Sequence, residues 1–151
     1  MKKNILIILI FFPFLAFSQV KLPKLISDGM ILQRDQAIPI WGWSSPFEKI
    51  DIRFGNQNVQ TQADSEGNWK VFMPKQKAGG PFVIQIKGKN TLEVKDVYVG
   101  DVFLCSGQSN MQLWMGRLKY TYPEEVKSAN FPLIRQFRVP NEYYLDRKSV
   151  V

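Results

Sequence analysis

Short segments in which apolar and polar residues alternate recur between residues 50 and 94, and they restrict the possible fold more than any other feature. The segments cover 50–54, 59–63, 69–73, 82–86 and 92–94. Glycine, asparagine, aspartate and proline lie between them, and these residues favour tight turns. A period of two is typical of strands that bury one face, and such closely spaced turns indicate stacked antiparallel sheets. We therefore expect residues 19–96 to form an all-β sandwich, similar to a jelly roll.

A pair of tryptophans stands out in the first half of this expected domain. Trp41 and Trp43 share one face of a strand, whereas Ile38 and Ile40 share the other, because side chains alternate along a strand. Two tryptophans on an exposed face could form a platform for sugar rings. Packing in a core or against another domain is the more common use of such residues.

The sequence changes character at residue 97. Residues 97–105 are strongly apolar, which is typical of a strand covered on both faces. A helix is predicted over 110–119, because apolar residues follow at helical spacing. These residues are Met111, Trp114, Met115 and Leu118. A short helix from Pro123 and a strand over 133–139 would complete one βαβ unit, so the fold class expected for the whole chain is mixed.

Ser109 lies where the expected strand gives way to the expected helix. At such a corner a hydroxyl can be held clear of the sheet, beside unpaired N–H groups at the positive end of the helix dipole. A serine hydrolase needs this arrangement for its nucleophile and for part of its oxyanion hole. On spacing alone, a serine that caps the helix is more common. The chain contains no histidine, so it lacks the usual base for such a nucleophile.

Residues 100–111, with the sequence GDVFLCSGQSNM, closely resemble the nucleophile segment of the sialate O-acetylesterases, which are carbohydrate esterases of the SGNH-hydrolase type. Four upstream motifs occur in that family's order: SDGMILQRD at 27–35, WGW at 41–43, GNW at 67–69 and AGGP at 78–81. The resemblance implies a β-sandwich followed by the first βαβ unit of an α/β SGNH-hydrolase domain. Residues 97–151 would be the start of that domain, which this chain does not complete.

The same resemblance implies roles for three neighbouring residues. Ser109 matches the nucleophile, and its backbone N–H would be one oxyanion donor. Gln108 and Asn110 flank it and are candidates for oxyanion or substrate contacts, although asparagine is also a favoured helix cap. The family's triad aspartate and histidine and its other oxyanion donors come from later segments. We therefore expect the chain alone to be inactive, and we expect no cofactor and no metal.

The resemblance implies a substrate as well, namely an O-acetylated sialic acid or a related acetylated sugar. Two alternatives stay open. One is an esterase with the same serine motif that acts on acetylated plant polysaccharide such as xylan. The other is a non-catalytic sugar-binding β-sandwich module in which Trp41 and Trp43 form the binding platform.

The first 18 residues have the pattern of a targeting segment. Lys2 and Lys3 precede an apolar stretch from Ile5 to Phe17, and Ala16 and Ser18 supply small residues at the positions that a signal peptidase reads. We expect residues 1–18 to be a signal peptide that is cleaved near Ser18. The mature protein would then be periplasmic or secreted, without a stable membrane anchor; an uncleaved anchor is the alternative.

Charge and cysteine content exclude further classes of function. The formal net charge is +7, but the lysines and arginines are scattered singly, which argues against a nucleic-acid partner. Cys105 is the only cysteine, so an internal disulfide is impossible. It continues an apolar run, and we expect it to be a small buried residue rather than a nucleophile.

Overall fold

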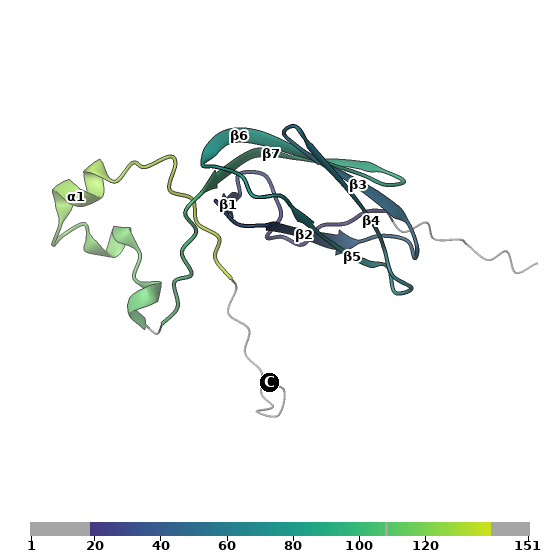
Figure 1. Cartoon of the computed structure of the whole chain (residues 1–151). Helices are drawn as coiled ribbons and strands as arrows, with labels where there is room; N and C mark the ends of the chain where they lie inside the picture. Colours follow the sequence, from purple (N-terminus) through teal and green to yellow (C-terminus); the bar gives the residue numbers. More distant parts are fainter. Residues whose placement is uncertain (1–18, 108, 140–151) are drawn as a thin grey trace, which may run out of the picture.

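The computed structural model describes residues 19–107 and 109–139 of the 151-residue chain. Strands β1–β7 form a β-domain, and a long segment with three short helices follows it in the chain (Figure 1). The strands are β1 Ile31–Gln33, β2 Ile38–Trp43, β3 Lys49–Phe54, β4 Gln57–Gln62, β5 Asn68–Met73, β6 Gly79–Lys87 and β7 Thr91–Gly100. Within the described residues, no helix is long and apolar enough to cross a membrane.

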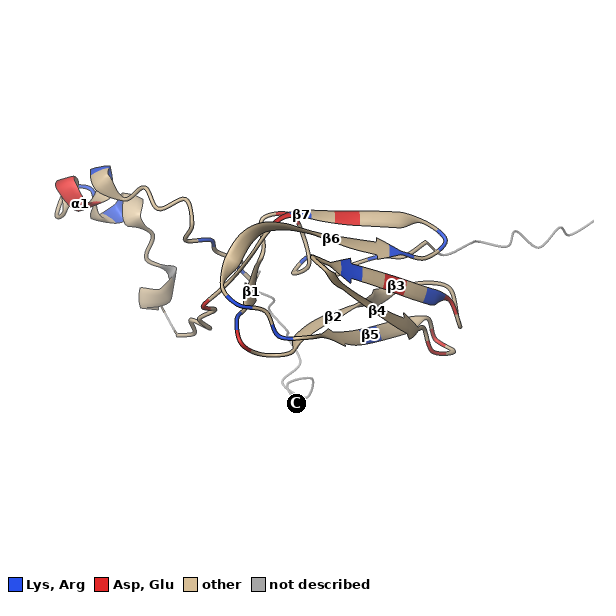
Figure 2. Ribbon diagram, turned by 45° about the horizontal axis from the view of Figure 1, so that its top comes forward, with Lys and Arg blue, Asp and Glu red and all other residues tan. Residues whose placement is uncertain are grey.

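The strands form two sheets that face each other (Figure 2). A five-stranded sheet has the order β1-β7-β6-β3-β4, and a two-stranded sheet pairs β2 with β5. All these pairs are antiparallel except β1–β7, which is parallel. The larger sheet curls until β4 approaches β5, where the Thr61 hydroxyl donates to the Lys70 carbonyl at 3.3 Å. The predicted all-β character is confirmed, whereas the likeness to a jelly roll is not.

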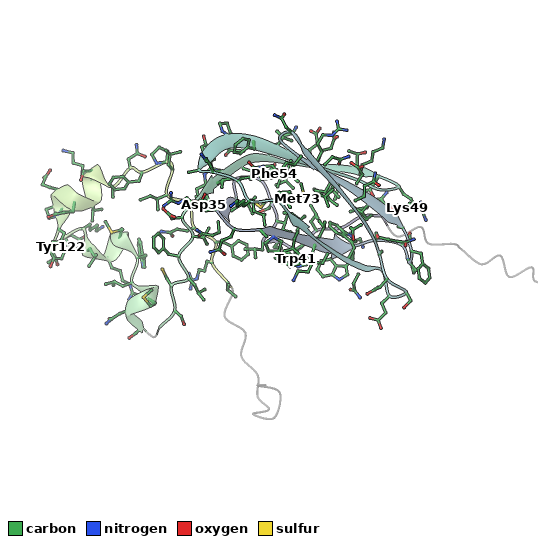
Figure 3. All side chains as sticks on the ribbon, viewed as in Figure 1. Asp35, Trp41, Lys49, Phe54, Met73 and Tyr122 are labelled. Atoms are coloured by element: carbon green, nitrogen blue, oxygen red, sulfur yellow. The ribbon has the colours of Figure 1, made fainter. Side chains whose placement is uncertain are left out.

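The core lies between the two sheets, as the alternation along the strands predicts. Every second residue of β2, β3 and β5 is buried. Phe54 and Met73 fill the space between the sheets (Figure 3), and the Phe54 ring meets the edge of Phe82 with the ring centroids 5.4 Å apart. The aliphatic side chains around them are Ile40, Ile50, Ile52, Ile84, Ile86 and Val97.

The turn between β4 and β5 forms where the sequence predicts one, and Asp64 organises it. The Asp64 carboxylate accepts hydrogen bonds from the backbone N–H of Asn68 at 2.8 Å and of Glu66 at 2.9 Å. These bonds, that of Asn68 first, lower the pKa of the Asp64 carboxyl because they favour its charged form. Gly67 adopts φ +86° in this turn, and a side chain there would meet the Ser44 carbonyl. The turn thus needs both the carboxylate and the glycine.

The predicted strand over 97–105 is only partly correct. β7 ends at Gly100 and belongs to the β-domain, where Val97 and Val99 are buried in the shared core. The sequence hides this continuity, because the two residues between Val94 and Val97 break the period of two. Asp96 sits there at φ +56°, and the pairing with β6 shifts nearby. β7 therefore crosses residue 96, and the division of the chain at that residue stays a prediction.

The predicted βαβ unit is not formed by the described residues. Residues 101–107 have no regular structure, and the single predicted helix is replaced by two 3₁₀ turns, η1 Ser109–Gln112 and η2 Met115–Leu118. Helix α1, Pro123–Ser128, starts at the predicted proline, but the strand predicted over 133–139 is absent. Met111, Trp114 and Met115 of the predicted helix are about half exposed or more, and only Leu118 of the four is partly buried, so the helix lacks most of the packing that stabilises helices in proteins.

Candidate active-site segment

Ser109 is the first residue of η1 and is exposed to solvent. Asn110 is also exposed, and its backbone carbonyl accepts a hydrogen bond from Leu113 at 3.3 Å. Gln108 lies outside the described residues, so its predicted role is not placed. The structure places Ser109 and Asn110 on one short turn, but the longer helix that the sequence predicts over 110–119 does not follow them.

Local packing explains why a glycine, Gly107, precedes this turn. A side chain on Gly107 would collide with the Met111 side chain, since a Cβ there would lie 2.5 Å from the Met111 Cγ. Met111 folds back over the chain at this point because no side chain occupies Gly107. The sequence of the segment therefore fits its own turn, independently of any catalytic use.

The described residues do not complete a catalytic group around Ser109. The sequence has no histidine, and the described residues contain no cluster of three histidine, cysteine, aspartate or glutamate side chains that could hold a metal. Cys105, predicted to be buried, is exposed because the strand that was predicted to contain it ends at Gly100. Neither of two cavities in the β-domain, of about 590 and 310 Å³, includes Ser109. Ser109 thus has no base within this chain that resembles a triad histidine.

Polar contacts fix the start of the segment 101–135, which carries Ser109, to the end of β1. The Arg34 N–H donates to the Gly100 carbonyl at 2.9 Å, and the Arg34 Nε lies 2.8 Å from the Asp101 carboxylate. The Val102 N–H donates to the Gln33 side-chain oxygen at 2.8 Å. The ion pair is half exposed and contributes little stability by itself. Together, however, these contacts set the direction in which the chain leaves β7.

Near the end of the segment, Arg135 contacts strand β7. Its Nη1 donates to the Asp96 carbonyl at 2.6 Å, and its Nη2 lies 3.0 Å from the Asp96 carboxylate. The guanidinium also lies over the Tyr98 ring, 4.5 Å from the ring centroid. Its side chain is only 21% exposed, so these contacts are better shielded than those of Arg34. We call Arg135, Asp96 and Tyr98 the Arg135 clamp.

Sequence reasoning did not find the Arg135 clamp. Its signal in the sequence is faint: one of two arginines in the mostly apolar stretch 131–139, with partners far away on β7. The fork of a guanidinium suits a carbonyl and a carboxylate side by side, and its flat face stacks on an aromatic ring. Lysine has neither property.

We expect Arg135→Ala to release the segment from β7. In limited proteolysis with chymotrypsin, cleavage within residues 103–137 should become at least about threefold faster. The reason is that a decrease of roughly 1 kcal/mol in the free energy of opening raises the population of the open, cleavable form by at least this factor. Arg138→Ala is the matched control, because Arg138 is an exposed arginine three residues away. Equal cleavage rates in the two variants would show that the clamp does not hold the segment.

Comparison with known proteins tests the predicted resemblance. No protein-family model matches the chain. The chain is 37% identical over 122 residues to the sialate O-acetylesterase of Homo sapiens, and 31% identical over 126 residues to that of Mus musculus. These matches cover 73% and 76% of this chain but only 23% of each relative. The chain thus spans about a quarter of the length of the curated relatives it matches.

A solved structure agrees with these relatives. The crystal structure of a carbohydrate acetylesterase from Xanthomonas citri superposes with a TM-score of 0.76 at 44% sequence identity. The superposition covers 81% of this chain and 28% of that protein. Over most of its own length, the chain is therefore a homologue of the sialate O-acetylesterases and of a carbohydrate acetylesterase, and the resemblance predicted from its residues is confirmed.

Proposed function

We propose that this chain supplies the β-domain and the nucleophile segment of a sialate O-acetylesterase, with Ser109 as the nucleophile. One observation carries the proposal: the segment GDVFLCSGQSNM lies in a chain that is homologous to acetylesterases over most of its length. The exposed position of Ser109 at the start of η1 supports it, because a nucleophile must be reachable by its ester.

The proposed chemistry is two-step acyl transfer. Ser109 Oγ attacks the acetyl carbonyl, its proton passes to a histidine base, and the sugar hydroxyl leaves with a proton from that base. Water then attacks the acetyl-serine, which releases acetate and restores the hydroxyl. The Ser109 N–H would stabilise the oxyanion together with donors that this chain does not contain. Because the base is absent, the proposal includes that the chain alone is essentially inactive.

A chimera tests this proposal. Residues 19–139 of this chain would replace the corresponding part of the Xanthomonas citri acetylesterase, which supplies the remaining residues of a complete enzyme. We expect acetate release from 4-nitrophenyl acetate and from O-acetylated sialic acid by the chimera, and none above background by the chain alone. A folded chimera without activity would contradict the proposed function. Turnover by the chain alone that depends on Ser109 would contradict the proposed inactivity.

The sugar is part of the proposal too. The relatives are named for sialate and for carbohydrate in general, and the names of the sialate relatives support an O-acetylated sialic acid as the substrate. Acetylated xylan is the alternative. The ratio of kcat/KM on O-acetylated sialic acid to that on acetylated xylan, measured with the chimera, separates the two.

Export completes the proposal. The basic start, the short apolar stretch and the small residues before Gln19 support a signal peptide cleaved near Ser18. Mass spectrometry of the protein recovered from outside the cytoplasm would identify the new N-terminus.

A further inference from the structure

A groove lies on the outer face of the two-stranded sheet, away from Ser109. It has a volume of about 590 Å³, and it is lined by Pro39, Trp41, Gly42, Trp43, Asp64, Asn68, Trp69 and Lys70. Figure 3 shows Trp41 on the side of β2 that points away from β6 and β7. None of these side chains is needed for the chemistry proposed for Ser109, so the groove is a separate feature.

The aromatic side of the groove is held rigidly. Trp41 is partly buried because it packs against the core cluster, whereas Trp43 is 45% exposed. Two backbone hydrogen bonds to Lys21, of 2.8 and 3.0 Å, hold Trp43 from the other side. Gly42 lies between the two tryptophans, and a side chain there would meet the Lys21 carbonyl and the Trp69 ring. The alternation of the strand thus presents two indoles on one face, on a backbone that these bonds hold in place.

Trp69 shows what a purely structural tryptophan looks like in this domain. It pairs with Gly42 across the strands, is 3% exposed and points into the core. Trp41 and Trp43 lie on the opposite face of the same sheet, and their exposed area is not needed to fill the core. Trp69 also lines the groove, but it is only 3% exposed, whereas Trp43 is 45% exposed.

Polar side chains stand directly opposite the tryptophans. In the register of β2 and β5, Trp41 faces Lys70 and Trp43 faces Asn68. The Asn68 amide donates to the Asp64 carboxylate at 3.3 Å, so the turn that Asp64 organises also orients Asn68. The Lys70 ammonium lies 4.9 Å from the centroid of the Phe72 ring. Lys21 pairs with Trp43 on its other side and adds a second cation at the same face.

We propose that this groove binds a short oligosaccharide that carries a carboxylated sugar. The apolar face of a pyranose ring stacks on flat, fixed indoles, while Asn68 and the indole N–H groups exchange hydrogen bonds with ring hydroxyls. The lysine beside each tryptophan favours a carboxylate on the same sugar chain. The Asp64 carboxylate keeps its charge in these hydrogen bonds and lies beside Asn68, so we place the carboxylate of the sugar on the Lys70 side of the groove. The inference goes beyond the proposed esterase, since binding here needs neither Ser109 nor a base.

Isothermal titration calorimetry of the full chain with 3′-sialyllactose and with lactose tests the proposal. We expect saturable binding of 3′-sialyllactose, with lactose at least about fivefold weaker. Trp43→Ala should weaken 3′-sialyllactose binding at least about tenfold, and Trp43→Phe should restore part of it. Lys70→Met should reduce 3′-sialyllactose binding to the level of lactose. Ser109→Ala should leave binding unchanged, which separates this proposal from the esterase proposal.

Trp114→Ala is the matched control, because Trp114 is 63% exposed and does not line the groove. Thermal unfolding of each variant by circular dichroism shows whether the fold is retained, which we expect for Trp43→Ala because its side chain is half exposed. Absence of heat with both sugars would overturn the proposal, as would equal losses in Trp43→Ala and Trp114→Ala. Equal affinities for the two sugars would overturn the carboxylate preference. A dimer in sedimentation that Trp43→Ala converts to a monomer would assign the face to self-association instead.

Discussion

Ser109→Ala in the chimera with the Xanthomonas citri acetylesterase is expected to lower kcat for an acetyl ester by about 10⁴-fold or more. Loss of the nucleophile in a serine hydrolase leaves only the oxyanion hole and substrate binding, and such losses reach about 10⁶-fold. The reason here is that Ser109 Oγ is the only atom of this chain to which the proposal assigns bond formation. Initial rates with 4-nitrophenyl acetate and with O-acetylated sialic acid measure the loss.

Ser106→Ala is the matched control for that experiment. Ser106 is an exposed serine three residues before Ser109 in the same segment, and no bond to the substrate is proposed for it. Its substitution should change kcat by less than about tenfold, because general disturbance of the segment is the only expected effect. If Ser109→Ala retained the activity of the chimera while Ser106→Ala lost it, Ser109 would not be the nucleophile.

Phe54→Ala is expected to lower the free energy of unfolding by about 3–5 kcal/mol, the usual cost of removing a buried phenylalanine. Phe54 is 1% exposed, lies between the sheets and meets the edge of the Phe82 ring, so its loss leaves a cavity that both sheets border. A domain of this size has only about 5–10 kcal/mol in total, so much of its stability would disappear. Urea unfolding, followed by circular dichroism and by the total tryptophan fluorescence, measures the change.

The control for the core is Phe47→Ala, because the Phe47 side chain is 64% exposed. Its effect should stay within about 0.5 kcal/mol, as is usual for surface positions. Similar effects of the two substitutions would mean that Phe54 does not carry the packing between the sheets that its burial indicates.

The sequence predicted the strands well where burial follows a period of two. Ile50, Ile52 and Phe54 alternate with polar residues and are all buried, so local pattern and tertiary environment agree. The prediction was wrong where tertiary contacts decide. The bulge at Asp96 hid the continuity of β7, and within the described residues Met111, Trp114 and Met115 of the helix predicted at 110–119 stay about half exposed or more. The family resemblance, in contrast, depends on residue identities and not on these elements, and the comparisons confirm it.

The candidate site divides in the same way. Ser109 and Asn110 were found from their sequence motif, and the structure places them on one exposed turn. The Arg135 clamp joins residues 39 positions apart, and no local pattern signals such a pair. Finding the groove required both the sequence and the structure. The two tryptophans are evident in the sequence, but only the register of β2 and β5 shows that Lys70 and Asn68 lie opposite them.

The attachment of residues 101–135 near β1 at their start and to β7 at their end has a practical consequence for mutational screens. Arg34 fixes the start of this segment and Arg135 fixes its end, so the place of Ser109 depends on a domain that contributes no reacting atom. In the chimera, variants that loosen the β-domain should therefore lose ester hydrolysis on warming, before the chimera as a whole unfolds. Repeating the assay at low temperature would restore their activity, whereas variants of the nucleophile would stay inactive at every temperature.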